Sequence, residues 1–392
     1  MKKKIFCLSI LMASFTTAFS QVKQKSTAKK AVFKYTNYVD PLIGTGFHGH
    51  VFVGANVPFG AVQLGPTNIS EGWDWSSGYH ISDSTIVGFQ HTHLSGTGIG
   101  DLGDISFMPT TGKLIVNRGR PGDLQDKNYY SLFDRKDELV KPGFYKVKLQ
   151  RYNVGVRLTA TNRVGFHEYT FPQSSKSHII IDLAAGIGWD KATKTYIKKV
   201  NNNTIEGYRY STGWAKDQRI YFTAVFSKQI KDFSVYDSLA LVNGIEATGR
   251  NLKGIISFAS VKNEKIAVKV GISPVSCANA LLNIKTEIPD WNFENVVAKA
   301  DAAWNKELSK IAIKADSTAQ LRKFYTALYH TMIAPSTFND ANGDYRGVDK
   351  KVYKKASFQN LTTFSLWDTY RAIHPLYTIV QPTRVNDMIN SM

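Results

Sequence analysis

The chain has 392 residues, of which 43% are hydrophobic and 12% aromatic, and its formal net charge at pH 7 is +18. This composition is that of a globular protein with enough apolar residues for two domains, not of a disordered tail. The lysines are scattered except at 21–30 and 350–355, and no nucleic-acid recognition motif accompanies them, so the charge indicates a solvated basic surface. We therefore expect no nucleic-acid partner.

Residues 1–20 are typical of a secretory signal peptide, because three lysines precede the apolar run Ile5 to Phe19. The mature chain is expected to be exported to the periplasm or the extracellular space, with a polar tail at 21–34. Removal of the signal also removes Cys7 and leaves Cys277 alone, so no intrachain disulfide is expected. No other apolar run is long enough to span a bilayer.

Residues 35–275 have the pattern of an antiparallel β-sandwich. Apolar side chains alternate over 145–149 and again over 154–160, and the turn candidate at 150–153 between them predicts a hairpin. Further strand-like runs lie at 179–183, 220–226, 255–258 and 266–272. Since no helical period interrupts them, we expect one large sandwich domain.

The period changes to a helical one after Pro289. Apolar residues over 293–311 follow the cap candidates Asp290 and Asn292, a second helix is expected over 321–332, and a third begins near Phe364. We expect a helical linker at 276–315 and a helical domain that starts at 316. That domain is expected to be incomplete at 392, because a helical bundle or toroid needs further helices to cover its faces.

Functional residue types are concentrated in the segment from Trp73 to Asp104. Trp73 and Trp75 flank Asp74, which places a carboxylate between two flat apolar faces. Proteins use this combination to stack on a sugar ring and to hydrogen-bond its hydroxyls. The frequent glycines of the segment indicate a backbone that bends repeatedly.

His91 and His93 are separated by one residue, so on a strand both rings would point to the same face, as metal ligands often do. Asp101 and Asp104 could complete such a set. Polar contacts to a ligand and hydrogen-bonded structural histidines are the alternatives.

Two sequence patterns are formal matches that their context does not support. The run Gly98-x-Gly100-x-x-Gly103 fits the dinucleotide fingerprint, but it lacks a buried strand before it and a helix after it, so a sharp loop is the better prediction. Asp340, Asn342 and Asp344 have the spacing of a calcium loop. Tyr345 stands where that loop needs glycine, so a polar turn is expected.

The stretch SLWDTYRAIHP combines Trp367, Asp368, Arg371 and His374. On one continuous helix, Trp367, Arg371 and His374 would share a face with Asp368 beside it. This set suits a carbohydrate ligand, and an ion pair between Asp368 and Arg371 is the structural alternative.

Taken together, these stretches resemble family 92 of the glycoside hydrolases, the calcium-dependent exo-acting α-mannosidases. The resemblance spans most of residues 36–392 and is carried by YVDPLIGTGFHGHVFVGANVPFGAVQLGP, GWDWSSGYH, GFQHTHLSGTGIGDLGDISFMPTTG, FYTALYHTMIAPSTFNDANGDYRGVD and FSLWDTYRAIHPLY. It implies an N-terminal β-sandwich, a helical linker and the start of an (α/α)6 toroid, with the site where the two domains meet.

The resemblance also implies a function, the inverting hydrolysis of a terminal α-mannoside assisted by Ca²⁺, in which one carboxylic acid protonates the leaving oxygen and one carboxylate activates water. It places the acid, the base and the calcium ligands beyond residue 392. The residues expected to line the mannose are Trp73, Trp75, His91, His93, Trp367, Asp368 and Arg371. Asp101 and Asp74 are expected to orient neighbouring side chains, and no metal ligand is expected within the chain.

Two other functions remain open from the sequence. A non-catalytic carbohydrate-binding module would explain the indoles but not the helices after Pro289. A zinc hydrolase would use His91 and His93 as metal ligands.

Overall fold

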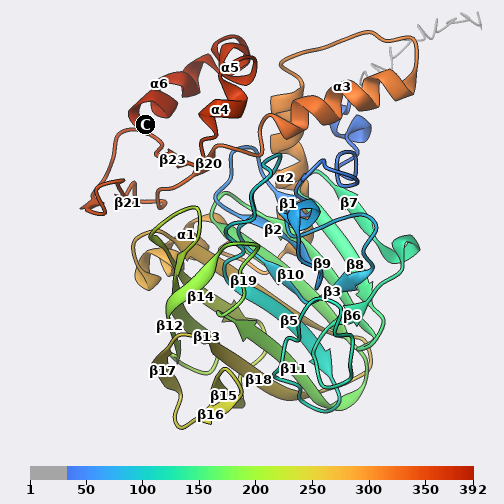
Figure 1. Ribbon diagram of the computed structural model, residues 1–392, viewed down its shortest axis with the longest axis vertical. Coiled ribbons are helices and arrows are strands. Elements are labelled where there is room, and N and C mark those ends of the chain that lie inside the picture. The colour runs from blue at the N-terminus through green and yellow to red at the C-terminus, as the bar shows by residue number, and fades with distance from the viewer. Residues whose placement is uncertain (1–32) are drawn as a thin grey trace, which may run out of the picture. The chain divides into compact units, whose positions relative to one another are not determined.

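The computed structural model describes residues 33–392. The predicted signal peptide and most of the predicted polar tail lie outside these residues. Within them, antiparallel β-sheets are followed by a mainly helical region, as the sequence predicts (Figure 1). In this part of the chain no helix has both the length and the apolar character that crossing a membrane requires.

Two large antiparallel sheets lie face to face and enclose the main hydrophobic core (Figure 1). Phe107 and Ile255 from one sheet and Phe222 and Val268 from the other are fully buried there. Burying a side chain of this size stabilises the fold by about 1.5–3 kcal/mol, so the shared core holds the two sheets together.

The strands of the eight-stranded sheet are, in spatial order, β1 (Ala55–Asn56), β2 (Gln63–Thr67), β4 (Gly88–Gln90), β5 (Ser106–Thr111), β11 (Ser174–Asp182), β18 (Leu252–Ser260), β15 (Asp232–Asp237) and β16 (Ala240–Val242). Those of the nine-stranded sheet are β17 (Glu246–Gly249), β12 (Lys191–Lys199), β13 (Thr204–Thr212), β14 (Gln218–Phe226), β19 (Glu264–Ser273), β10 (Val164–Phe171), β9 (Val154–Ala160), β8 (Phe144–Leu149) and β7 (Leu139–Lys141). The smaller pairs are β3 (Thr85–Ile86) with β6 (Ser131–Leu132), β20 (Ser336–Thr337) with β23 (Leu361–Thr362), and β21 (Tyr345–Arg346) with β22 (Val352–Tyr353). Short 3₁₀ helices are η1 (Tyr35–Tyr38), η2 (Trp73–Trp75) and η3 (Arg135–Asp137).

The predicted hairpin is confirmed as β8 and β9, which pair from Phe144↔Thr159 to Leu149↔Val154. The turn between them closes by a hydrogen bond of 3.2 Å from the Asn153 backbone N–H to the Gln150 carbonyl. Asn153 has a φ of +51°, a left-handed conformation that asparagine tolerates better than most residues.

Three helices follow the sandwich: α1 (Cys277–Glu287), α2 (Phe293–Leu308) and α3 (Thr318–His330). The side chain of Asn292 caps α2 by accepting a hydrogen bond of 3.0 Å from the Asn295 backbone, as the sequence predicts. Helices α2 and α3 form a second core with the N-terminal segment. In that core, Trp304 is fully buried and donates to the Asn56 carbonyl at 2.8 Å.

The prediction of one continuous helix from Phe364 is wrong. The segment is divided into α4 (Leu366–Thr369), α5 (Ile373–Val380) and α6 (Pro382–Asn390). Pro375 explains the first break, because in a continuous helix its ring would clash with the carbonyl of residue 371, whereas the first turn of α5 tolerates it. Trp367, Arg371 and His374 therefore do not share one helical face.

A row of buried hydrogen bonds crosses the sandwich interior. The His91 ring accepts or donates at both nitrogens, with Nδ1 2.6 Å from the Ile105 carbonyl and Nε2 3.0 Å from Nε2 of His167. Nδ1 of His167 lies 2.8 Å from the Tyr169 hydroxyl. Because a carbonyl only accepts, the polarity of the row is fixed: His91 donates from Nδ1, His167 donates from Nε2, and Tyr169 donates its O–H. Protonating His91 would set its Nε2–H against the Nε2–H of His167, and protonating His167 would set its Nδ1–H against the O–H of Tyr169.

This row predicts a loss of stability in acid. Burial lowers the pKa of His91 to about 4 and that of His167 well below its usual value. Between about pH 4 and 6.5 the unfolded state therefore binds more protons than the folded state. The free energy of unfolding has its full value above about pH 6.5, and as the pH drops below that it falls by about 1.4 kcal/mol per pH unit for each such histidine. Urea unfolding at pH 7, 6 and 5 measures this slope, and His167→Leu should make it shallower although it lowers stability at pH 7. An unchanged slope in that variant would contradict the assignment.

Candidate functional site

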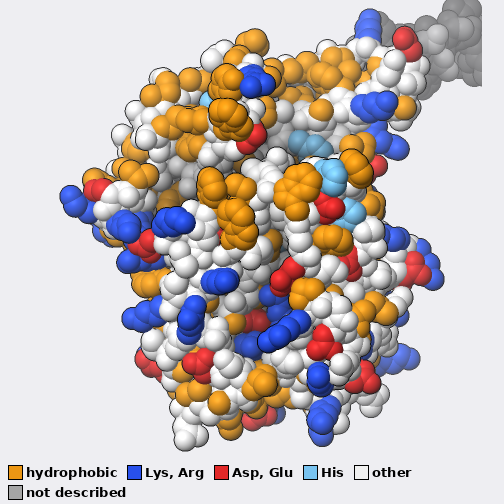
Figure 2. Space-filling view, viewed as in Figure 1, with side chains coloured by type: hydrophobic (Ala, Val, Ile, Leu, Met, Phe, Trp, Pro, Cys, Tyr) orange, Lys and Arg blue, Asp and Glu red, His pale blue; other side chains and the backbone are white. Residues whose placement is uncertain are grey.

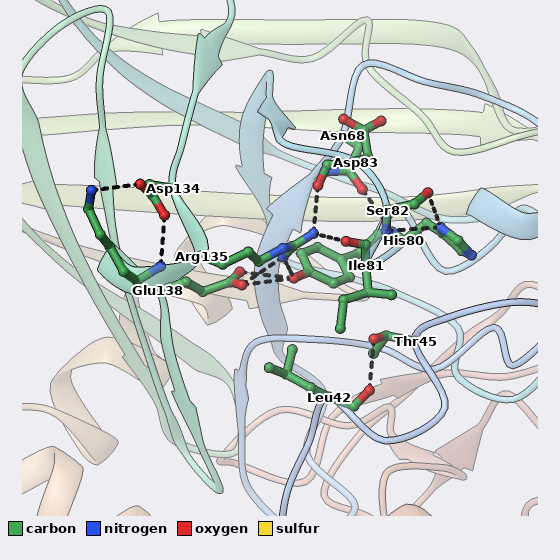
Figure 3. Close-up of polar contacts among 12 residues, drawn as sticks. Leu42, Thr45, Asn68, His80, Ile81, Ser82, Asp83, Asp134, Arg135 and Glu138 are labelled. Carbon is green, nitrogen blue, oxygen red and sulfur yellow. Dashed lines mark hydrogen bonds and ion pairs between the residues drawn. The ribbon is translucent and has the colours of Figure 1, made fainter.

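The loop that carries Trp73 and Trp75 is held from below by Arg135. Figure 3 shows the Arg135 guanidinium between the Ile81 and Asp83 backbones and the Glu138 carboxylate. Its distances to Glu138 and to the Asp83 carbonyl are 2.7 and 2.6 Å, and it also donates to the Tyr79 hydroxyl. Because Glu138 is almost fully buried, Arg135 supplies its countercharge, and the loop is fixed to the sandwich at several points.

Trp73 is 57% exposed and lies on a cluster of aromatic rings. Its ring centroid is 4.7 Å from that of His48 and 4.5 Å from that of His50, and its Nε1–H donates to the Gly98 carbonyl at 3.0 Å. On the face seen in Figure 2, histidine side chains gather beside hydrophobic and acidic ones. Trp73 thus keeps much of its indole open to solvent while its position is fixed.

Asp74 orients a histidine in this cluster. Its carboxylate is 2.6 Å from Nδ1 of His48, and this hydrogen bond lowers the pKa of Asp74. Trp75 is less exposed than Trp73, since it donates to the Asp83 carboxylate at 3.2 Å and packs on the His80 ring at 4.9 Å. Of the two indoles, Trp73 is the one available for stacking.

The structure separates His91 from His93. Neither lies on a strand, since β4 ends at Gln90, so the expectation of two rings on one strand face is wrong. His91 is fully buried in the sandwich core, and both of its ring nitrogens have protein partners. His93 hydrogen-bonds the Gln63 carbonyl through Nδ1 at 2.8 Å, and its Nε2 has no hydrogen-bond partner among the described residues.

His93 and Asp368 line the same cavity of about 380 Å³, which we call the histidine pocket. This volume is within the usual range for small-molecule sites. Its wall includes three histidines from distant parts of the chain, and their buried ring nitrogens without a hydrogen-bond partner among residues 33–392 are His93 Nε2, His330 Nε2, and both Nδ1 and Nε2 of His374. The hydroxyl of Thr97, in the same wall, is also buried and without a partner there. Since buried polar groups are nearly always hydrogen-bonded, this pocket is built to receive a polar ligand.

Two histidines of the pocket, His93 and His330, are neutral at pH 7. Burial lowers the pKa of both His93 and His330 to about 4. Because Nδ1 of His93 donates to a carbonyl, its Nε2 is an acceptor, suited to a hydroxyl donor. Val51, Ile333 and Phe364 add apolar surface to the same wall. Neutral acceptors and donors beside apolar surface suit an uncharged polyol.

Asp101 lies at a second, larger cavity of about 850 Å³, which we call the sheet-edge cavity. The turn between β13 and β14, the start of β14 and the 336–365 loops contribute to its wall. Asp101 is 3% exposed and accepts a hydrogen bond of 2.8 Å from the Ala215 backbone, and burial raises its pKa. Asp101 therefore fixes the 213–215 turn. The sequence had suggested that it orients a neighbouring imidazole, and the structure shows no such contact among residues 33–392.

Asp368 is exposed and its carboxylate accepts a hydrogen bond from the Ser365 hydroxyl. Arg371 lies over the ring of Tyr370 and donates to its hydroxyl at 2.8 Å. Trp367 is 82% exposed. Neither Trp367 nor Arg371 lines the two cavities, so of the four residues in this motif the structure brings Asp368 and His374 to the histidine pocket.

No group of three or more His, Cys, Asp or Glu side chains within residues 33–392 is arranged to hold a metal ion. In the polar turn at 340–344, the carboxylate oxygens of Asp340 accept hydrogen bonds from Ser273, Asn279 and Asn283 at 2.8 Å each. This carboxylate therefore binds side chains of α1 and β19. The zinc alternative based on His91 and His93 gains no support from this geometry.

The sequence did not indicate His330 as a pocket residue, and His374 was not among the residues expected to line the mannose. His330 ends α3 and His374 is in the first turn of α5, so their approach depends on how the helices pack. No periodicity within either segment signals it.

Comparison with known proteins identifies the family. The glycosyl hydrolase family 92 N-terminal domain matches residues 38–273, and the glycosyl hydrolase family 92 catalytic domain matches residues 279–392. The chain therefore belongs to glycosyl hydrolase family 92.

Three similar proteins illustrate the match. A family 92 α-mannosidase from Bacteroides thetaiotaomicron, solved with mannoimidazole, is 38% identical with a TM-score of 0.88, over 92% of this chain and 48% of that chain. An inverting mannosidase of the same family and organism is 26% identical with a TM-score of 0.79, over 92% and 49%. An uncharacterized secreted glycosidase of Arthroderma benhamiae is 26% identical over 85% of this chain and 45% of its own length. The chain thus spans about half the length of these relatives.

The Arg135 contacts predict that replacing Arg135 destabilises the protein, whereas replacing its neighbour Lys136 does not. Arg135→Ala leaves the buried Glu138 carboxylate without its cation, so we expect a loss of about 1–3 kcal/mol, reduced by the partial exposure of Arg135, and faster proteolysis within 73–83. Lys136→Ala is the matched control, because Lys136 pairs with Asp134 at the surface, and this substitution should leave the stability almost unchanged. Urea unfolding and limited proteolysis measure both effects, and equal behaviour of the two variants would contradict the role of Arg135.

Proposed function

We propose that this protein removes terminal α-linked mannose from glycans, and that the chain contributes the N-terminal part of the sugar pocket. The observation that carries the proposal is the histidine pocket in a family 92 glycosidase, where His93 and Asp368 line one cavity with histidine nitrogens that have no hydrogen-bond partner among residues 33–392. The family 92 relatives from Bacteroides thetaiotaomicron, which are named as mannosidases, support mannose as the sugar.

The chemistry of the pocket suits binding more than bond cleavage. The neutral Nε2 of His93 would accept a hydrogen bond from one sugar hydroxyl, and the Asp368 carboxylate would accept hydrogen bonds from two neighbouring hydroxyls. Apolar side chains of the wall would contact the C–H face of the ring. Hydrogen bonds to buried groups that otherwise lack partners add affinity and select the hydroxyl pattern of the sugar, because a sugar without that hydroxyl leaves them unpaired.

An inverting reaction would need two further groups. One carboxylic acid protonates the leaving oxygen and one carboxylate activates a water molecule, with the two carboxyl groups about 6.5–9.5 Å apart to admit that water. We propose that this acid and base are supplied from outside residues 33–392. Calcium dependence is part of the same proposal, and its ligands would also come from elsewhere, since the described residues offer no metal group. Bound calcium would add positive charge near the sugar hydroxyls.

We further propose the domain organisation that the family resemblance implies. The sandwich would comprise residues 35–275 and the helical linker 276–315, and residues 316–392 would begin an (α/α)6 toroid. The protein would be exported by the signal peptide at 1–20, which agrees with the secreted glycosidase among its relatives.

The first test is mannose release from α-linked mannobioses by the protein expressed from its complete reading frame, with calcium and with chelator, beside the 392-residue chain. We expect release by the protein from the complete frame with calcium, a large loss with chelator, and no release by the 392-residue chain. Release that chelator does not affect would remove the calcium proposal. Binding of mannosides without release by either protein would favour a carbohydrate-binding module.

A second test concerns Asp368. Asp368→Asn removes the charge from a hydrogen-bond acceptor of the pocket, and hydrogen bonds to charged groups contribute about 1.5–3 kcal/mol, so kcat/KM for mannobiose should fall roughly 10- to 100-fold. Asp232→Asn, an exposed change at the start of β15, is the matched control and should leave kcat/KM unchanged. Equal activity of the two variants would remove Asp368 from the site.

A further inference from the structure

Trp189 and Trp214 form an exposed aromatic pair that the sugar pocket does not use. Their side chains are 61% and 63% exposed, their ring centroids are 6.2 Å apart, and the ring planes are inclined at 34°. Trp214 lines the sheet-edge cavity. Two large indoles left open to water, one of them at the wall of a cavity, are an unusual arrangement, since such residues are normally buried or in contact with a ligand.

The strand pairing brings the two indoles near each other. β12 and β13 pair antiparallel, and the pairing ends with Lys191 opposite Thr212. Trp189 and Trp214 each lie two residues beyond that pair, in the turns that adjoin the two strands. The two rings therefore meet just beyond the end of this strand pair.

The backbone beneath each indole is fixed by buried contacts. The Trp189 N–H donates to the Gly100 carbonyl at 3.0 Å, and Asp190, the next residue, pairs with the fully buried Arg209. On the other side, the residue after Trp214 donates its N–H to the buried Asp101 at 2.8 Å. The backbone that carries both indoles is therefore fixed, which reduces the conformational entropy lost when a ligand stacks on them.

The tyrosines on β12 and β13 are packed differently from the two tryptophans. Tyr196, Tyr208 and Tyr210 stack at 5.2 and 4.5 Å with ring planes within 24° of parallel, so their faces cover one another. The larger separation and tilt of the tryptophan pair leave indole faces free. A free, fixed indole face beside polar side chains is suited to the C–H face of a sugar ring. Lys216 and Gln218 in the same cavity wall provide such polar groups.

We propose that Trp189 and Trp214 form a stacking platform for a sugar of the glycan that lies beyond the first two residues at its terminal end. The choice of a mannose-containing glycan rests on the proposed function. The platform would increase the affinity for longer oligosaccharides and would not contribute to binding of the terminal sugar.

The experiment compares mannobiose with mannotetraose as substrates for the protein from the complete reading frame. Trp189→Ala and Trp214→Ala should each lower kcat/KM for mannotetraose about tenfold, which corresponds to ~1.4 kcal/mol, and leave that for mannobiose unchanged. Trp214→Phe should retain most of the preference because it keeps an aromatic face. Trp291→Ala, which removes another exposed tryptophan that packs on Lys269, is the control and should change neither value.

Calorimetric titration with a thio-linked mannotetraose, which resists hydrolysis, makes the test independent of catalysis. Binding weakened about tenfold in the two alanine variants, with wild-type affinity in Trp291→Ala, would support the platform even if the wild-type protein released no mannose and the proposed function failed. Equal losses on short and long substrates, or wild-type affinity in the alanine variants, would overturn the platform while leaving mannose release intact. Failure of the wild-type protein to bind the tetrasaccharide would overturn it as well.

Discussion

The arrangement of both cavities depends on one fully buried ion cluster. Arg209 points inward from β13, donates to Asp104 at 2.8 Å and to the Leu183 carbonyl at 3.0 Å, and pairs with Asp190. Burial raises the pKa of Asp190 to about 6, and the charge of Arg209 opposes that rise. Removing one member of such a cluster strands a buried charge, at a cost of about 3–5 kcal/mol. The cluster therefore joins the nine-stranded sheet to the segments that precede β5 and β12.

The segment fixed in this way is the glycine-rich loop at 94–104, and the candidate site is arranged around it. Residues 94–97 line the histidine pocket, Ile99 and Asp101 line the sheet-edge cavity, and the Gly98 and Gly100 carbonyls accept from Trp73 and Trp189. Gly100 is needed because a Cβ there would lie 2.7 Å from the Gly188 Cα. One loop thus contacts the histidine pocket, Trp73 and Trp189, so a change at Arg209 should disturb all three together.

Much of the fold could be predicted from the sequence, because apolar alternation and the Asn292 cap are local signals that the structure follows. β13 could not, since its pattern is reversed: Tyr208 and Tyr210 face outward and Arg209 faces the interior. Reading aromatic residues as core and arginine as surface fails where an ion cluster replaces apolar packing. The candidate site was only partly predictable for a different reason. His93 and Asp368 stand in motifs, but His330 joins them only through the packing of α3 against α5.

The contrast between the two kinds of buried polar group distinguishes scaffold from site. In the core, both ring nitrogens of His91 and His167 have partners, and each guanidinium nitrogen of Arg209 donates to an oxygen of Asp104, Asp190 or Leu183, which helps to fix the packing of the two sheets. In the histidine pocket, equally buried nitrogens of His330 and His374 have none among the described residues. Leaving such atoms unpaired costs about 1–3 kcal/mol each, and a ligand that pairs them recovers that free energy. The paired histidines therefore add to the stability of the fold. The histidine nitrogens without a partner among residues 33–392 are the ones that can add to the affinity for a ligand.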